Sequence, residues 1–253
     1  MSSYLERLER LIAAGRKAQT SSRGDFDFSR PRRIPFWMPD RIARWTVSQF
    51  LHGEIATATA CAALAARFGD GPEAVALDIQ RQDEQRHASF YEAYLEPLGG
   101  PMPVDPVLER AYMTASSSAV TPAATLLAFH VLLEGESLGL QKLVGRWLPC
   151  PLFAEISARV ARDEARHVAF GRLWLCEHLR TLNVAEHRRL HSWLRRLWLV
   201  TMVEMVDRLG AFDIVTGPTP WHCWVEDAWT EREDELRRLG LVFSASSRGE
   251  CAA

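Results

Sequence analysis

The chain has 253 residues, of which 47% are hydrophobic, and its 32 acidic residues nearly balance 30 basic ones. That length and apolar content suit one large domain or two small ones with a packed core. The near balance of charge argues against a protein that binds nucleic acid through a general positive excess. The longest uncharged stretch, residues 111–133, contains serines, a proline and a histidine, so we expect no membrane-spanning helix.

The five cysteines form no CxxC pair and no close ladder with histidines, so the sequence indicates neither a zinc ribbon nor a redox dithiol. An odd number of cysteines in a chain without a signal peptide is typical of a reduced, cytoplasmic protein. We therefore expect a cytoplasmic location.

Helical periodicity runs through nearly the whole chain, and no segment of alternating β-branched residues competes with it. An N-terminal helix is predicted after Ser3, which is placed with Glu6 as a capping box. The polar stretch from Thr20 to Arg33 is interpreted as a linker. Four long helices are predicted next, each bounded by proline or glycine, over about residues 39–68, 72–96, 121–148 and 151–182.

Three shorter or more peripheral helices complete the prediction. One short helix is expected at about 105–114 and another, rich in charge, at about 226–239. The helix predicted at about 184–212 has a wide apolar stripe, which suits a helix covered on two sides and makes a homodimer an expectation. The predicted fold class is all-α. Its expected parts are an N-terminal helix and linker, a helix bundle, and a C-terminal loop, short helix and tail, over residues 1–35, 36–212 and 213–253.

Two of the long helices carry the same pattern, Asp-Glu-x-Arg-His, at residues 83–87 and 163–167. Another glutamate precedes each motif glutamate by 30 residues, and the two halves are related by a fixed offset of 80 residues. A single Glu-x-x-His match is expected by chance about 0.6 times in this composition, so the doubled and extended pattern carries the signal. It indicates a duplicated helix pair. The paired glutamates are Glu54 with Glu84 and Glu134 with Glu164.

Glutamate and histidine three residues apart lie on one face of a helix and can bind the same metal ion. One inward-facing glutamate from each of the other two helices would complete a site of four carboxylates and two imidazoles. Four carboxylate charges neutralise two divalent ions, so the filled interior would carry no uncompensated charge. Oxygen and imidazole donors suit iron or manganese. The candidate ligands are Glu54, Glu84, His87, Glu134, Glu164 and His167.

The doubled pattern resembles that of the ferritin-like diiron-carboxylate oxygenases. Its Asp-Glu-x-Arg-His form resembles the p-aminobenzoate N-oxygenases and the bacterial multicomponent monooxygenases, over roughly residues 41–182. The resemblance implies a ferritin-like four-helix bundle, and it implies two iron ions held by the six candidate ligands. It also implies that Asp83 and Asp163 accept hydrogen bonds from the ligand histidines, each on the opposite helix. The sequence departs from the N-oxygenases at Val160, where they carry an extra histidine ligand.

Three further residues are spaced about one helical turn from candidate ligands. Tyr91 follows His87 by one turn, where the small subunit of ribonucleotide reductase carries its radical tyrosine, but a packed tyrosine is the default interpretation. Thr57 shares a helix face with Glu54 and either meets bound oxygen or packs. His130 precedes the glutamate at 134 by one turn, as a seventh ligand or, more commonly, a core histidine.

The helix that contains Glu134 has two unusual features. Glu136 lies two residues further on, so on a regular helix it would point elsewhere and ranks below Glu134 as a ligand. Gly135 and Gly139 cost helix stability, about 1 kcal/mol each relative to alanine. They indicate a π-bulge, room for a substrate, or close helix packing.

These features predict a non-haem diiron oxygenase that activates O2 to hydroxylate or N-oxygenate a small organic substrate. An external reductase must supply the electrons, because the sequence has no flavin, nicotinamide or iron–sulfur fingerprint. Manganese in place of iron remains open. The alternatives are a peroxide-processing dimetal enzyme, such as a manganese catalase or a rubrerythrin-like peroxidase, and a ferroxidase or iron-binding ferritin-like protein. We expect no nucleic-acid partner and no membrane partner.

Overall fold

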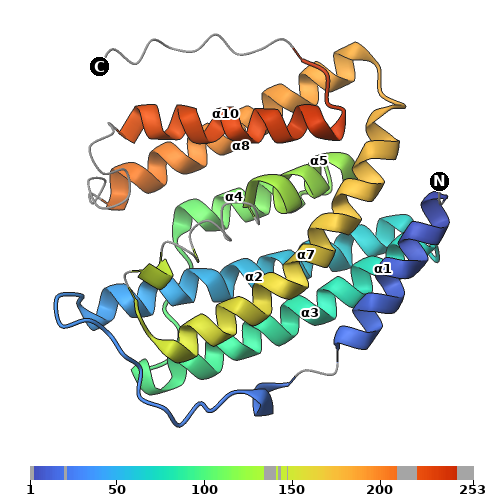
Figure 1. Ribbon diagram of the computed structural model, residues 1–253. Helices are drawn as coiled ribbons and strands as arrows, with labels where there is room; N and C mark the ends of the chain where they lie inside the picture. The colour runs from blue at the N-terminus through green and yellow to red at the C-terminus, as the bar shows by residue number, and fades with distance from the viewer. Residues whose placement is uncertain are drawn as a thin grey trace. The chain divides into compact units, whose positions relative to one another are not determined.

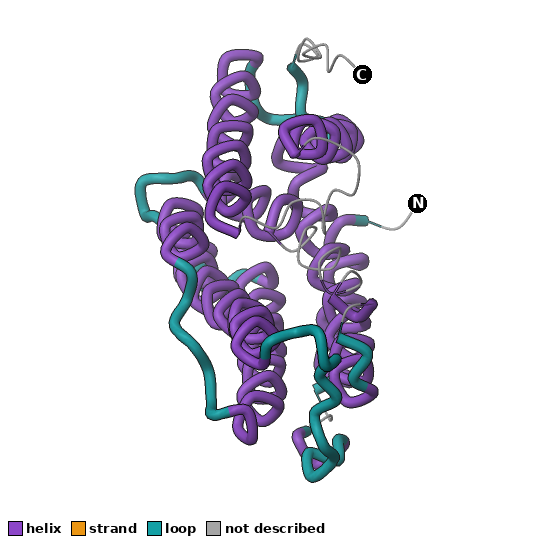
Figure 2. Tube along the Cα trace, turned by 90° about the vertical axis from the view of Figure 1, so that its left-hand side faces the viewer, coloured by secondary structure: helices purple, strands orange, loops and turns teal. Residues whose placement is uncertain are grey.

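The computed structural model describes residues 3–19, 22–133, 141, 144–146, 148–209 and 221–243. Every regular element within these ranges is a helix, and Figure 2 shows only helix and loop along the described trace. The predicted all-α fold class is therefore confirmed. Within the same ranges, no helix combines the length and the apolar character needed to cross a bilayer.

The helices follow the predicted order, and α1 (Tyr4–Ala18) and α5 (Pro122–Leu126) begin after residues whose side chains cap them. The Ser3 hydroxyl accepts a hydrogen bond from the backbone of Glu6, which completes the expected capping box. Thr121 caps the helix that begins at Pro122 in the same way. The elements are α1 (Tyr4–Ala18), the 3₁₀ helix η1 (Arg23–Asp25), α2 (Asp40–Phe68), α3 (Pro72–Leu95), the 3₁₀ helix η2 (Glu96–Leu98), α4 (Pro106–Ser116), α5 (Pro122–Leu126), the π-helix η3 (Leu127–Leu133), α7 (Pro151–Leu179), α8 (Val184–Leu209) and α10 (Trp221–Leu239).

The helix predicted over 121–148 differs most from expectation. It starts at Pro122, but after five residues it continues as the π-helix η3, which is described over Leu127–Leu133. A π-helical turn is thus present in this helix, upstream of the glycines that suggested one. Gly135 and Gly139 themselves lie outside the described residues.

The chain divides by its contacts into two compact units. The first comprises Met1–Asp105 and Leu133–Leu173, and the second comprises Pro106–Leu132 and Trp174–Ala253. In the first unit α2 and α3 run side by side as an antiparallel pair joined by a short glycine-containing turn, and α1 packs on α3 (Figure 1). Its core combines aliphatic and aromatic side chains of α2, α3 and the first turns of α7, among them Val47, Leu51, Phe90, Tyr94, Phe153 and Ile156.

The segment between α1 and α2, interpreted from sequence as a linker, makes packing and capping contacts in the first unit. The ring of Phe26 packs edge-on against Phe90, with 4.9 Å between centroids. The Arg32 guanidinium donates hydrogen bonds to the carbonyls of Ala93 and Tyr94, at 2.9 and 2.8 Å. These carbonyls belong to the last turn of α3, which has no intrahelical donors for them, so Arg32 caps the helix.

In the second unit α8 packs against α4 and α10 (Figure 1). A buried polar cluster joins α8 to α10: Nε2 of His191 lies 2.8 Å from Oε1 of Glu233, which also accepts a 2.9 Å hydrogen bond from the indole of Trp229. Within the described residues, Cys61, Cys150 and Cys176 are free thiols.

Candidate metal centre

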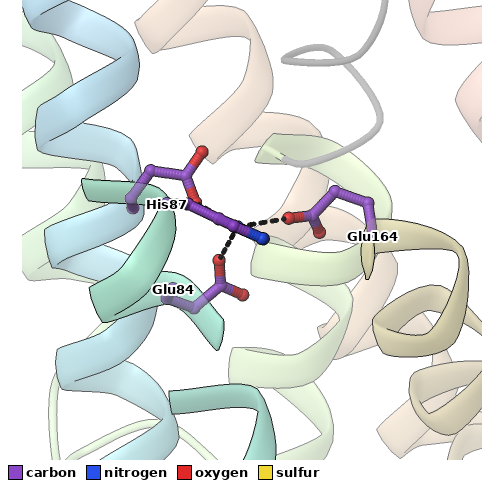
Figure 3. Close-up of side chains that lie close together, drawn as sticks. Glu84, His87 and Glu164 are labelled. Atoms are coloured by element: carbon purple, nitrogen blue, oxygen red, sulfur yellow. Dashed lines mark hydrogen bonds and ion pairs between the residues drawn. The ribbon is translucent and has the colours of Figure 1, made fainter. Parts of the chain in front are cut away.

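Five of the six candidate ligands lie within the described residues, and all five come together in the first unit. One potential ligand atom from each of four residues lies within 4.8 Å of all the others, and all four residues are buried: Glu54, Glu84, His87 and Glu164. Figure 3 shows the side chains of Glu84 and His87 from α3 and of Glu164 from α7 pointing toward one another. Glu134 and Glu136 lie outside the described residues.

Both histidines turn the same ring nitrogen toward the carboxylates. Nδ1 of His87 lies 3.3 Å from Glu54, 3.4 Å from Glu84 and 3.5 Å from Glu164. Nδ1 of His167 lies 3.1 Å from Glu84 and 3.1 Å from Glu164. The two imidazoles therefore approach one group of carboxylates from α3 and from α7.

The opposite nitrogen of each ring contacts an aspartate on the other helix. Nε2 of His87 lies 3.1 Å from Asp163, and Nε2 of His167 lies 3.1 Å from Asp83. A carboxylate only accepts hydrogen bonds, so Nε2 carries the hydrogen in both rings. Once Nδ1 has lost its own proton, its lone pair would face a cation among the glutamates, and the aspartates lie where the resemblance placed them.

Two arginines complete a crossed network between α3 and α7. Arg86 contacts Asp163 at 2.8 Å as well as Asp83 on its own helix, and Arg166 contacts Asp83 at 2.9 Å as well as Asp163. Each arginine thus forms an ion pair with an aspartate of the facing helix. Burial would raise the pKa of both aspartates, but the histidines and arginines hold each pKa below its ordinary value.

The pKa shifts within the cluster follow from its burial and from the charges that its members place beside one another. Burial raises the pKa of Glu54 well above its ordinary value, so Glu54 tends to be neutral. Burial alone would lower the pKa of His87 and of His167, but the surrounding carboxylates raise both pKa values well above the ordinary one. Burial would also raise the pKa of Glu84, yet the histidines hold it well below its usual range. In the absence of cations, these shifts favour protons on the histidines and on Glu54.

Three other predicted residues lie in buried positions. Thr57 is buried on α2, on the face that carries Glu54. Tyr91 is fully buried, its ring stacks on Phe50 with 6.0 Å between centroids, and burial raises its pKa well above the ordinary value. These contacts make Tyr91 part of the core, as the default interpretation held. His130 is buried within η3, and its expected relation to the glutamate at 134 involves a residue outside the described chain.

Gln80 is a site residue that the sequence reasoning missed. Its side chain is 2% exposed, and Nε2 donates a 3.0 Å hydrogen bond to Oε1 of Glu84, four residues further along α3. The spacing could have revealed it, because residues four apart share one helix face. A glutamine one turn before a motif glutamate was the available signal.

A small, partly open cavity of about 20 Å³, with room for about one water molecule, lies beside the centre, between α1, α3 and α7. Apolar α1 residues, with Leu11 and Ile12 among them, line one side. The other side includes Gln80, Asp83 and His167, so the cavity reaches the outer side of the metal-ligand candidates.

The comparisons with known proteins show the fold. No protein-family model matches the chain, and no curated protein matches its sequence. Solved structures do match: a variant of an R2-like ligand-binding oxidase with an anaerobically reconstituted Mn/Fe cofactor has a TM-score of 0.73 at 17% identity, and a second variant with an aerobically reconstituted Mn/Fe cofactor has a TM-score of 0.71 at 16% identity. Each match covers 90% of this chain and 92% of the other. The chain therefore has the ferritin-like fold of these structures.

Proposed function

We propose that this protein is a dimetal-carboxylate oxidase that uses O2. The observation that carries the proposal is the buried cluster in which Glu54, Glu84, His87 and Glu164 bring ligand atoms within 4.8 Å of one another. His167 faces the same glutamates from α7. We include Glu134 as the sixth ligand on the strength of the sequence repeat.

The residues present fit a pair of divalent ions. Carboxylate oxygens and imidazole nitrogens are donors that iron and manganese accept. The aspartate–arginine network around them is neutral in itself, because Asp83 and Asp163 pair with Arg86 and Arg166. The negative charge of the glutamates inside this network is therefore what the cations would balance. The Mn/Fe cofactor named for the matched oxidases supports two metals here, with iron and manganese both open.

When bound, the metal pair would supply the electrons that reduce O2 and the oxidising power that acts on substrate. The chain's own residues have a positioning task. Asp83 and Asp163 hold the imidazoles in one tautomer, and the guanidinium groups of Arg86 and Arg166 fix the aspartates. The buried surroundings exclude water from the carboxylates and strengthen every charge interaction there. Thr57, on the face of Glu54, is proposed to lie beside the bound reactant.

The finer description is a monooxygenase that hydroxylates or N-oxygenates a small organic molecule with electrons from an external donor. It is supported by the doubled Asp-Glu-x-Arg-His motif and by the lack of a second redox fingerprint in the sequence. The homodimer expected from the apolar stripe of α8 stays a prediction, which sedimentation would test.

Metal analysis followed by rapid mixing tests the proposal. The purified chain should contain two iron ions, or one iron and one manganese, and its reduced form mixed with O2 should give a transient visible absorption. Glu84→Ala and His167→Ala should each abolish stoichiometric loading. Glu92→Ala, which removes an exposed glutamate from the same helix α3, is the matched control and should load normally.

Two results would contradict the proposal. Full metal loading in both Glu84→Ala and His167→Ala would refute the ligand assignment. Two manganese ions together with O2 evolution from peroxide would assign the site to a peroxide-processing enzyme.

A further inference from the structure

The two halves of the sequence repeat differ at one position beside the cluster. Adding the 80-residue offset to Gln80 gives Val160, so the residue one turn before the motif glutamate is an amide in one half and a hydrocarbon in the other. Val160 is fully buried in the core of the first unit and can donate no hydrogen bond. The glutamate of the second half, Glu164, therefore lacks the side-chain donor that Glu84 receives from this position.

The contact made by Gln80 is directed at a candidate ligand. The amide reaches Oε1 of Glu84 at 3.0 Å, and the same oxygen lies 3.1 Å from Nδ1 of His167. Gln80 thus acts on the oxygen that also meets the histidine of the opposite helix. An amide donor to a buried carboxylate restricts the carboxylate's rotation, and such a hydrogen bond is stronger than one between neutral groups.

The helix α1 holds this part of α3 in place. It crosses α3 so closely that a Cβ added at Gly15 would lie 2.7 Å from Cγ2 of Ile79, the residue before Gln80. The side chain of Gln19, just after α1, donates a 3.4 Å hydrogen bond to the carbonyl of Ile79. The backbone that carries the Gln80 amide is therefore fixed from outside.

We infer that Gln80 is a positioning residue that orients Glu84 toward metal, a support that Val160 at the equivalent position does not give Glu164. The inference rests on the proposed dimetal function and extends it. The amide holds Oε1 of Glu84, which lies 3.1 Å from Nδ1 of His167, and not Oε2, which lies 3.4 Å from Nδ1 of His87. The two metal ions are therefore bound with unequal affinity. Loss of the amide weakens one ion selectively.

The test compares Gln80→Met with Gln85→Met. Methionine keeps the length of glutamine and removes the donor, while Gln85 is an exposed glutamine on the same helix that accepts a hydrogen bond from Arg81. Each variant is titrated with Mn(II), following free Mn(II) by electron paramagnetic resonance, and with Co(II), following its visible absorption bands. Thermal unfolding of the metal-free proteins reports whether each variant folds. Gln80→Leu serves if methionine prevents folding.

Wild type should bind two Mn(II) ions in two distinguishable steps. Gln80→Met should weaken one step by about 10- to 100-fold, the usual effect of removing a group that supports a metal ligand, and change the other by less than about threefold. The Co(II) bands should shift in the same variant and stay unchanged in Gln85→Met.

Wild-type affinities and an unchanged Co(II) spectrum in Gln80→Met would overturn the inference while leaving the proposed function intact. Equal weakening of both steps, or the same loss in Gln85→Met, would also overturn it. If wild type binds neither Mn(II) nor Co(II), the proposed function fails first and the inference fails with it.

Discussion

Replacing Asp163 by asparagine tests the crossed network directly. In the protein, Oδ2 of Asp163 accepts from Nε2 of His87 at 3.1 Å and from Arg86 at 2.8 Å, and Oδ1 accepts from Arg166 at 2.7 Å. Asparagine keeps the shape of the side chain but has one acceptor oxygen instead of two. The NH2 of its side-chain amide, which donates hydrogen bonds, must therefore face a guanidinium or imidazole N–H that also donates, so one hydrogen bond is lost.

The expected loss of stability follows from the burial of these side chains. The side chain of Asp163 is 4% exposed and that of Arg86 is 11% exposed, so solvent replaces the lost acceptor poorly. A hydrogen bond to a charged group contributes about 1.5–3 kcal/mol, and removing one member of a buried ion pair costs about 3–5 kcal/mol. Since asparagine retains one acceptor, Asp163→Asn should lower the free energy of unfolding by about 3 kcal/mol. It should also weaken metal binding by about 10- to 100-fold.

Urea unfolding of the metal-free protein, followed by circular dichroism, measures the first effect, and Mn(II) titration measures the second. Glu155→Gln is the matched control, because it alters an ion pair of the same chemistry between Arg30 and α7 at the surface. That control should leave both quantities unchanged. A loss below about 1 kcal/mol in Asp163→Asn would refute the reasoning, since the network would then behave as a surface ion pair.

Two further predictions concern packing. Gly15→Ala should destabilise the protein by about 1–3 kcal/mol in urea unfolding because its Cβ would meet Ile79. The control Gly145→Ala has open space around it and should be neutral or stabilising; equal effects of the two would contradict the predicted contact. In the second unit, Glu233→Gln weakens the contact with His191 and should cost about 1–3 kcal/mol, so an unchanged unfolding midpoint would argue against a stabilising cluster there.

Much of the fold could be predicted because its signals are local. The capping box of Ser3 and Glu6, and prolines such as Pro72 and Pro122, mark helix ends in the sequence itself, and the structure begins its helices there. The crossed aspartate–histidine contacts were also accessible, since the repeat and the resemblance together placed each aspartate on the opposite helix. The helical periodicity and the sequence repeat were thus enough to predict the order of the helices and the main polar contacts between them.

The features that the sequence analysis missed are contacts and burial that sequence spacing alone does not reveal. Glu233 and His191 are 42 residues apart on different helices, so no local sequence pattern predicts their hydrogen bond. Phe26 lies in a segment whose polar composition concealed an aromatic contact with the core of α3. Gln80 had the right spacing, but glutamine is common on helix surfaces and only its burial distinguishes it. Tertiary packing, rather than propensity, decides each of these cases.

Because of the crossed contacts, the hydrogen bonds of both histidines depend on how far α3 is shifted along α7. Each imidazole is steered by a carboxylate on the facing helix, so a slide of one helix along the other would turn both rings together. A displacement of one helical turn, about 5.4 Å, would remove both acceptors at once. Mutations far from the centre that change this alignment would therefore alter the contacts of both histidines together.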